Sequence, residues 1–456
     1  MRRHVIVGHF GPLDRPKVPV AADEVVTRLD LVTSEELLDH GVGHALEDLE
    51  ELGIFPSEIG LDLLVLATLV HAADTRIARA TESQDTWTRE LRLVLPVSDP
   101  VLWTGASSLL ERMLDFLTGD RWTIWFRPRP RDFASAVPTR PGRFITPPFD
   151  GLALFSGGLD SLIGAINMLE AGGTPLLVSH AGEGATSDAQ STCLEALEAH
   201  YEHRAFARLR VWMNFPEDLV RDVAVERTTR GRSFLFFAVG VFVGTGLGRT
   251  FTLCAPENGL IAINVPLDLL RLGALSTRTT HPFYMARWNE LIAILGIPGS
   301  VMNPYWDKTK GEMVASCANP ALLTRLVPST LSCSSPTKGR WQGRGVEHCG
   351  YCLPCLIRRA ALKGGLKSRA DPTTYTVPNL AAQVLDTLGS AGQQVRSLQF
   401  AIERLRTNPD LARLLIHKPG PLSDVPPANI DALAGVCRRG MDEVAALLLG
   451  VRTRPG

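Results

Sequence analysis

The stretch 152-LALFSGGLDSLIGAINML-169 places two glycines, two serines and an aspartate between an apolar run and a helical pattern. The run 152–155 is typical of a short buried strand. Leucine and isoleucine then recur at helical spacing, at Leu159, Leu162, Ile163, Ile166 and Leu169. The loop 156–161 therefore opens a helix, where unpaired backbone N–H groups and the positive end of the helix dipole favour an anion. The stretch predicts a phosphate-binding loop at the end of a strand.

The residues of this loop indicate which kind of phosphate site it forms. A Walker loop needs Gly-Lys-Ser/Thr and a dinucleotide loop needs G-x-G-x-x-G, and neither pattern is present. The hexapeptide instead resembles the S-G-G-x-D-S signature of the PP-loop ATP pyrophosphatases, which split ATP between its α and β phosphates. That resemblance implies an ATP-binding loop made of Ser156, Gly157, Gly158, Leu159, Asp160 and Ser161. Within it, Asp160 is expected to orient the loop or to help hold Mg²⁺. An ordinary capped strand-to-helix turn is the alternative.

Composition limits the class of protein. A chain of 456 residues is long enough for two or three domains. Its net charge of -1 gives no general attraction to nucleic acid or to a membrane surface, so nucleic acid is not expected as a direct substrate. No apolar run approaches a membrane span, and we expect a cytoplasmic protein. Eight cysteines in such a chain favour metal binding or reactivity over disulfides.

The order of apolar patterns predicts four segments. Residues 1–128 mix strands and helices and predict an N-terminal α+β domain, and the proline-rich residues 129–150 predict a linker. In residues 151–365, strands alternate with helices, which predicts a parallel sheet with its ligand crevice at the carboxyl ends of the strands. Residues 366–456 predict a helical extension. Its first expected helix, 379–389, carries an apolar face made of Leu380, Val384, Leu385 and Leu388.

A second informative cluster lies in "LSCSSPTKGRWQGRGVEHCGYCLPCLIRR", residues 331–359. Its cysteines form C-x-x-C-x-x-C with one more upstream, and they are Cys333, Cys349, Cys352 and Cys355. Four thiolates suit a closed, structural zinc site, and an iron–sulfur cluster is the alternative. The remaining cysteines stand alone and are expected in the core, and His348 is expected beside the metal site without being a ligand.

Together, the loop and the cysteine cluster resemble the 7-cyano-7-deazaguanine synthase (QueC-like) family. Three segments between them also match, in the expected order: "GRSFLFFAVG" from Gly231, "APEN" from Ala255 and "NPYWDKTKGEMV" from Asn303. The resemblance implies a PP-loop (HUP-like) parallel-sheet core over residues 150–365. It further implies that Arg232 and Lys310 neutralise the phosphates or the activated carboxylate. Two residues ending the second strand, Ser179 and His180, are expected near the adenosine.

The same resemblance implies a reaction. ATP adenylates a 7-deazaguanine carboxylate, pyrophosphate leaves, and an amine attacks the acyl-adenylate; with ammonia, a second ATP dehydrates the amide to a nitrile. The whole arrangement resembles the QueC-like component of Qat anti-phage defence systems. That resemblance implies a variant in which the amine belongs to a partner protein, docked on the flanking regions, instead of to ammonia. Two alternatives remain: a nucleotide-binding sensor or scaffold subunit without turnover, and another PP-loop enzyme such as an NAD synthetase, a GMP synthetase or a tRNA thiolase. The balanced charge and clustered cysteines disfavour the thiolase.

Overall fold

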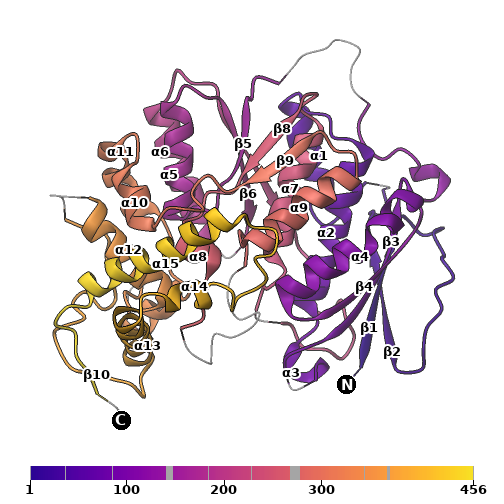
Figure 1. Ribbon diagram of the computed structural model, residues 1–456. Coiled ribbons are helices and arrows are strands. Elements are labelled where there is room, and N and C mark those ends of the chain that lie inside the picture. Colours follow the sequence, from indigo (N-terminus) through magenta and orange to yellow (C-terminus); the bar gives the residue numbers. More distant parts are fainter. Residues whose placement is uncertain are drawn as a thin grey trace.

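Two larger parallel β-sheets, with helices between and around them, form the main body of the described part of the protein (Figure 1), and a two-stranded parallel sheet lies in its C-terminal part. The computed structural model describes residues 2–35, 37–84, 86–139, 147–182, 184–226, 228–267, 278–343, 345–366 and 370–454. The mixed α/β class expected from the sequence is confirmed. Part of the expected linker, residues 140–146, lies outside the described residues.

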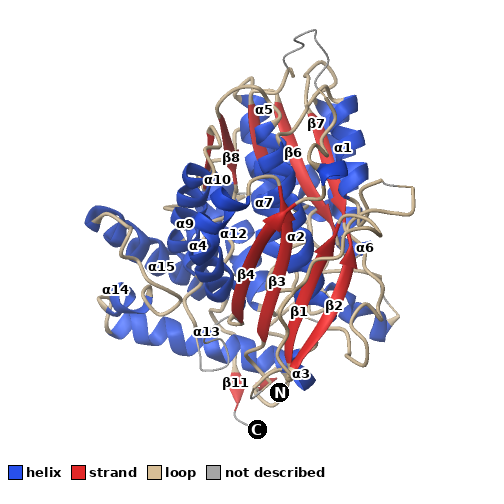
Figure 2. Ribbon diagram, turned by 90° about the vertical axis from the view of Figure 1, so that its right-hand side faces the viewer, coloured by secondary structure: helices blue, strands red, loops and turns tan. Residues whose placement is uncertain are grey.

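The first sheet belongs to the N-terminal region and has the strand order β2-β1-β3-β4, all parallel. Its strands are β1 (Arg3–His9), β2 (Glu24–Asp30), β3 (Glu90–Val97) and β4 (Arg121–Pro128). The connecting helices are α1 (Val42–Glu51), α2 (Glu58–Arg76), α3 (Arg79–Glu82) and α4 (Pro100–Thr118). Figure 2 shows the four strands side by side with α2 behind them. The α+β domain expected for this region is wrong, because all of the paired strands in this sheet are parallel. Parallel neighbours require crossover connections, and the connections from β2 to β3 and from β3 to β4 contain helices.

The second sheet has the strand order β7-β6-β5-β8-β9, again all parallel. Its strands are β5 (Gly151–Leu154), β6 (Pro175–Ala181), β7 (Ala207–Trp212), β8 (Phe251–Cys254) and β9 (Gly299–Met302). The helices along this part of the chain are α5 (Leu159–Glu170), α6 (Gly184–His200), α7 (Arg232–Thr245), α8 (Gly259–Ile263), α9 (Pro282–Ile294), α10 (Lys310–Ala315) and α11 (Pro320–Leu326). The strand order reverses between β5 and β8, and ligands bind at this kind of switch point in doubly wound sheets.

Helices α2 and α7 lie against each other between the two sheets and join them into one core. Every residue from Gly60 to Thr75 of α2 is buried, and so is every residue from Phe234 to Gly244 of α7. A helix that is apolar on all sides is stable only when it is covered on all sides. The N-terminal region is therefore part of the same hydrophobic core as the second sheet.

The C-terminal part packs on α8 and α12 through its own hydrophobic cluster. It follows α12 (Leu353–Gly365) and contains β10 (Leu385–Asp386), α13 (Ser390–Thr407), α14 (Leu411–Leu415), α15 (Pro427–Leu447) and β11 (Thr453–Arg454). Short 3-10 turns occupy Arg131–Phe133, Val327–Ser329 and Pro336–Gln342. The helix expected over 379–389 is wrong: this segment is irregular and supplies the short strand β10. Its apolar residues divide accordingly, with Leu380 and Leu385 buried and Leu388 exposed.

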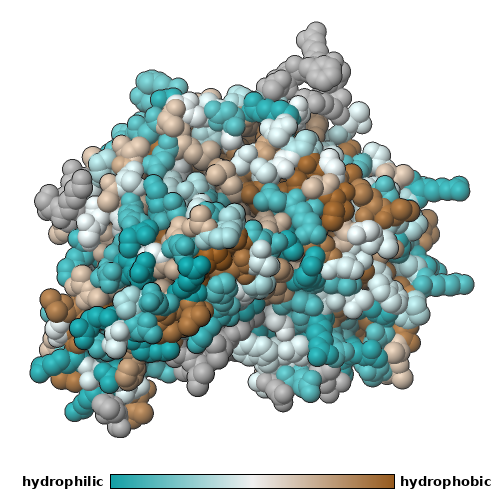
Figure 3. All heavy atoms as spheres, in the orientation of Figure 1, coloured by the Kyte–Doolittle hydropathy of each residue, from teal (hydrophilic) through white to brown (hydrophobic). Residues whose placement is uncertain are grey.

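On the face shown in Figure 3, hydrophilic side chains predominate and hydrophobic ones form smaller groups between them. Within the described ranges, the structure contains no helix with the length and apolar character needed to cross a bilayer.

Candidate functional site

The glycine-rich loop has the shape that its sequence predicts, between the end of β5 and the start of α5. Gly157 has a φ of 76°, and a β-carbon there would lie 2.9 Å from the backbone nitrogen of Gln190. Both facts require glycine. Gly158 is the N-cap residue of α5 and supplies no side-chain cap. The hydroxyl of Ser161 donates to the Gly158 carbonyl over 3.0 Å and lies 3.3 Å from that of Ser156. The loop thus ends at an uncapped helix N-terminus.

A pocket of about 460 Å³ opens beside this loop at the carboxyl end of the second sheet. Its wall draws on parts that lie far apart in the chain: the loop, the start of α6, the segment before α7, the first turns of α7, the segment after β8, residues 279–280 and residues 331–333. Polar groups from these parts include Ser156, Ser161, Thr229, Arg232, Glu257 and Thr280. The pocket is large enough for a nucleotide-sized ligand.

Asp160 and Lys310 form a buried ion pair beneath the pocket wall. The Lys310 ammonium donates to Asp160 Oδ1 over 2.6 Å, and both side chains are about nine-tenths buried. The second oxygen, Oδ2, accepts from the backbone and side-chain nitrogens of Asn258, at 3.1 and 2.7 Å. The structure therefore brings these two candidate site residues together, and neither of them is among the residues that line the pocket. These hydrogen bonds join the carboxylate to α10 and to the segment after β8.

The C-terminal helix α15 fixes the start of α10, where Lys310 lies. Glu443 of α15 accepts a hydrogen bond from the Gly311 backbone over 3.2 Å and one from the Thr309 hydroxyl. Thr309 also forms a capping box with Glu312. The Lys310 ammonium thus contacts α5 through Asp160, while α15 holds the start of the helix that carries it.

Glu257 is a pocket residue that the sequence analysis did not select. Its carboxylate accepts a hydrogen bond from the Thr280 hydroxyl and borders the Asp160–Lys310 pair. Removal from bulk water raises its pKa to about 7, and the charge of Asp160 adds to this effect. The available signal was its position in "APEN", directly after a parallel strand, where functional groups collect.

Arg232 lies in the pocket as expected. It is the first residue of α7, its guanidinium carbon lies 5.3 Å from the centre of the Phe236 ring, and it lines the pocket. An arginine at this point places a permanent positive charge in the wall of the pocket. Among the described residues, Arg232 is the basic side chain in the pocket wall.

Ser179 and His180 are not brought into this pocket. The Ser179 hydroxyl is fully buried and donates to the Phe155 carbonyl over 2.7 Å. The His180 ring packs against His71 and Phe236, on the side of β6 that faces α2 and α7. Burial lowers the pKa of His180 to about 2, so the ring is neutral. Both residues have the contacts of core residues.

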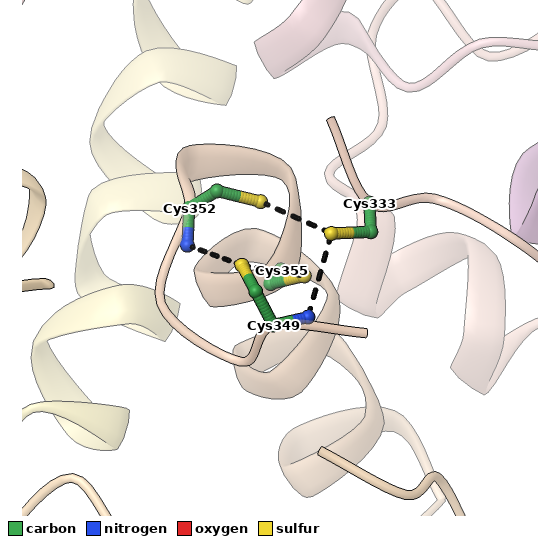
Figure 4. A group of neighbouring side chains, drawn as sticks. All are labelled: Cys333, Cys349, Cys352 and Cys355. Atoms are coloured by element: carbon green, nitrogen blue, oxygen red, sulfur yellow. Dashed lines mark hydrogen bonds between the residues drawn. The ribbon is translucent and has the colours of Figure 1, made fainter. Parts of the chain in front are cut away.

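The four clustered cysteines converge as their spacing predicts (Figure 4). Their sulfur atoms all lie within 4.8 Å of one another. Two of the pairs, Cys333 with Cys352 and Cys349 with Cys355, are 3.9 Å apart. A tetrahedral zinc with Zn–S bonds of about 2.3 Å would separate its sulfurs by about 3.8 Å. The group can therefore hold a metal ion such as zinc.

Backbone hydrogen bonds also suit this group to a metal. The Cys349 and Ser335 amides each donate to the Cys333 sulfur over 3.4 Å, and the Cys352 amide donates to the Cys349 sulfur over 3.3 Å. Such bonds stabilise thiolates, as does the N-terminus of α12, which begins right after Cys352. Hydrogen bonds from the neighbouring thiols lower the pKa of Cys352. His348 is not part of the group; its Nε2 accepts from the Ser332 amide over 3.1 Å.

The cysteine cluster and the glycine-rich loop are directly connected. Cys333 lines the pocket, and the nearby Leu331 amide donates to the Gly157 carbonyl over 2.9 Å. Arg358 of α12 is fully buried and donates to Thr330 Oγ1 and to the Val327 carbonyl, each over 2.7 Å. The metal-site helix thus holds the segment that forms one wall of the pocket.

No family model matches the sequence, and no curated protein matches it. The function is therefore inferred from the pocket, the glycine-rich loop and the cysteine cluster.

Proposed function

We propose that the protein is an ATP-dependent ligase that adenylates a 7-deazaguanine carboxylate, releases pyrophosphate and transfers the acyl group to an amine. The observation that carries the proposal is the meeting of the S-G-G-L-D-S loop, Arg232 and Glu257 in one pocket at the sheet's switch point. An uncapped helix N-terminus and a guanidinium suit phosphates, and a carboxyl with a pKa near 7 suits proton transfer. In the proposed reaction, the helix N-terminus and the guanidinium serve the adenylation step, and the carboxyl serves the attack of the amine.

The first step forms an acyl-adenylate. An oxygen of the substrate carboxylate attacks the α-phosphorus of ATP, a new P–O bond forms, and the bond to the β-phosphate breaks, so that pyrophosphate leaves. Loop amides and Arg232 offset the negative charge that gathers on the phosphates. Mg²⁺ is expected with the nucleotide and would neutralise further phosphate charge. Because both oxygens of Asp160 have protein partners, its geometry supports the role of orienting the loop.

The second step forms an amide. The amine nitrogen attacks the acyl carbon, the C–O bond to AMP breaks, and AMP leaves with that electron pair. The nitrogen then carries an excess proton, which Glu257 accepts. We propose ammonia or an amine of a partner protein as the acceptor, with anti-phage defence as the setting; with ammonia, a second ATP would dehydrate the amide.

The role of Glu257 predicts a pH dependence for the second step alone. Its basic form predominates above a pKa of about 7, so amide formation should rise as the pH increases through 7. Glu257→Gln should lower amide formation at pH 8 by about 100-fold. Pyrophosphate release should change much less, because it needs no base. Thr280→Val, which removes the hydroxyl donor to Glu257, is the milder variant. Equal losses in both steps would contradict this role.

The proposed function is tested by incubating the full-length protein with ATP, Mg²⁺ and a 7-deazaguanine carboxylate. Pyrophosphate release that requires the carboxylate is expected. Intact-mass analysis of the protein and of candidate partner proteins then shows whether an amine has been acylated. ATP binding without carboxylate-dependent pyrophosphate release would overturn the ligase proposal in favour of a nucleotide-binding scaffold.

A further inference from the structure

The segment that leads to Arg232 depends on the N-terminal region for its position. Between β7 and α7 the chain runs from residue 213 to residue 231 without a described helix or strand. This segment contains the pocket residue Thr229 and leads into the pocket residue Arg232, the first residue of α7. Residues 74–79, at the end of α2 and just after it, contact this segment repeatedly. The Glu226 amide donates to the Thr75 carbonyl over 3.1 Å, and the Arg79 amide donates to the Glu226 carboxylate over 2.7 Å.

The contact nearest to the pocket is made by Asp74. Its Oδ2 accepts a hydrogen bond of 2.7 Å from the backbone amide of Gly231, the N-cap residue of α7. Arg232, the next residue, projects into the pocket wall. Asp74 has no exposed surface, and α2 is buried on all sides, so this anchor is rigid.

A buried ion network fixes the Asp74 carboxylate in turn. Its Oδ1 accepts from Arg89 over 3.0 Å and from Arg79 over 3.3 Å. Asp120 completes the network by accepting from both arginines. The two aspartates and two arginines balance in charge, and all four are buried. Of these four residues, Asp74 is the one that accepts the hydrogen bond from the Gly231 amide in the described part of the chain.

We propose that Asp74 is a positioning residue of the pocket: by holding the Gly231 amide, it fixes the start of α7 and with it the guanidinium of Arg232. The N-terminal region then serves the site directly. The anchor itself does not depend on the proposed reaction. Its effect on substrate rests on the proposed function, because it assumes that Arg232 meets the phosphates.

The experiment compares matched substitutions in one network. Asp74→Ala removes the acceptor of the Gly231 amide, Asp120→Ala removes the other carboxylate, and Asp74→Asn keeps an acceptor oxygen while removing the charge. The probe is inorganic pyrophosphate with Mg²⁺, and its affinity is measured by calorimetry. We expect Asp74→Ala to weaken binding about tenfold. Asp120→Ala and Asp74→Asn should lower the melting temperature with a smaller effect on affinity.

A double-mutant cycle separates positioning from general destabilisation. If Asp74 acts through Arg232, then Asp74→Ala should cost little further affinity in an Arg232→Ala background. Additive losses, or equal losses from Asp74→Ala and Asp120→Ala, would overturn the proposal.

Amide hydrogen exchange tests the anchor in the unmodified protein, without any ligand. The Gly231 amide should exchange as slowly as amides inside α7, although it precedes the helix. Exchange at the rate of a free loop would overturn the proposal even if Asp74→Ala fails to fold. Slow exchange combined with no pyrophosphate binding by the unmodified protein would leave the anchor intact and count against the proposed function alone.

Discussion

Replacing Cys352 by serine is expected to remove the bound metal and to loosen both α12 and one wall of the pocket. We expect about one zinc per chain in the purified protein, because four converging thiolates form a closed tetrahedral site. A serine hydroxyl stays protonated at neutral pH and is a poor ligand. Structural zinc sites bind with about 10 kcal/mol or more, and this free energy is linked to folding.

The expected loss should reach the pocket through Leu331. Its amide donates to the Gly157 carbonyl, and Cys333 lies two residues further on in the pocket wall. Cys352→Ser should therefore lower metal content, melting temperature and ATP affinity together. Cys437→Ser is the matched control, since this cysteine is buried and lies outside the cluster. A Cys352→Ser protein with full metal content would contradict the four-thiolate site. A brown protein that contains iron and acid-labile sulfide would show that the four cysteines hold an iron–sulfur cluster instead of zinc.

Replacing Asp160 by asparagine is expected to lower pyrophosphate release about 100- to 1,000-fold, the size of the effect of removing one preorganised electrostatic group. Asp160 pairs with Lys310 and accepts two hydrogen bonds from Asn258, so it sets the position of the loop relative to α10 and the end of β8. The neutral amide would leave the Lys310 ammonium buried without a counter-charge. That loss should cost about 3 kcal/mol of stability as well.

The double variant Asp160→Asn, Lys310→Met separates these two effects. It removes both charges, so the melting temperature should recover much of the loss. Pyrophosphate release should stay low, because the loop still lacks its anchor. Recovered turnover in the double variant would mean that Asp160 serves only to neutralise Lys310. Two measurements on the single and the double variant decide between these results: carboxylate-dependent pyrophosphate release, and the melting temperature from calorimetry.

The flanking regions carry a role that their sequences did not indicate. We expected residues 1–128 and 366–456 to dock a partner protein, and that role stays a prediction. Contacts from these regions reach the site, because Asp74 holds the start of α7 and Glu443 holds the start of α10. Deleting either region would also uncover buried apolar helices, so point substitutions are the better test of docking.

The sequence by itself determined the features whose evidence is local. The loop between a strand and a helix and the convergence of the cysteines both follow from short-range spacing, and the structure confirms them. Local periodicity predicted a helix at 379–389, but this segment is irregular. It buries Leu380 and Leu385 against other segments without forming a helix. Only the tertiary structure showed that Glu257 lies beside Asp160 and that the His180 ring packs in the core against Phe236. Those outcomes depend on which strands become neighbours and which sheet face is covered, and both are set by contacts between residues far apart in the chain.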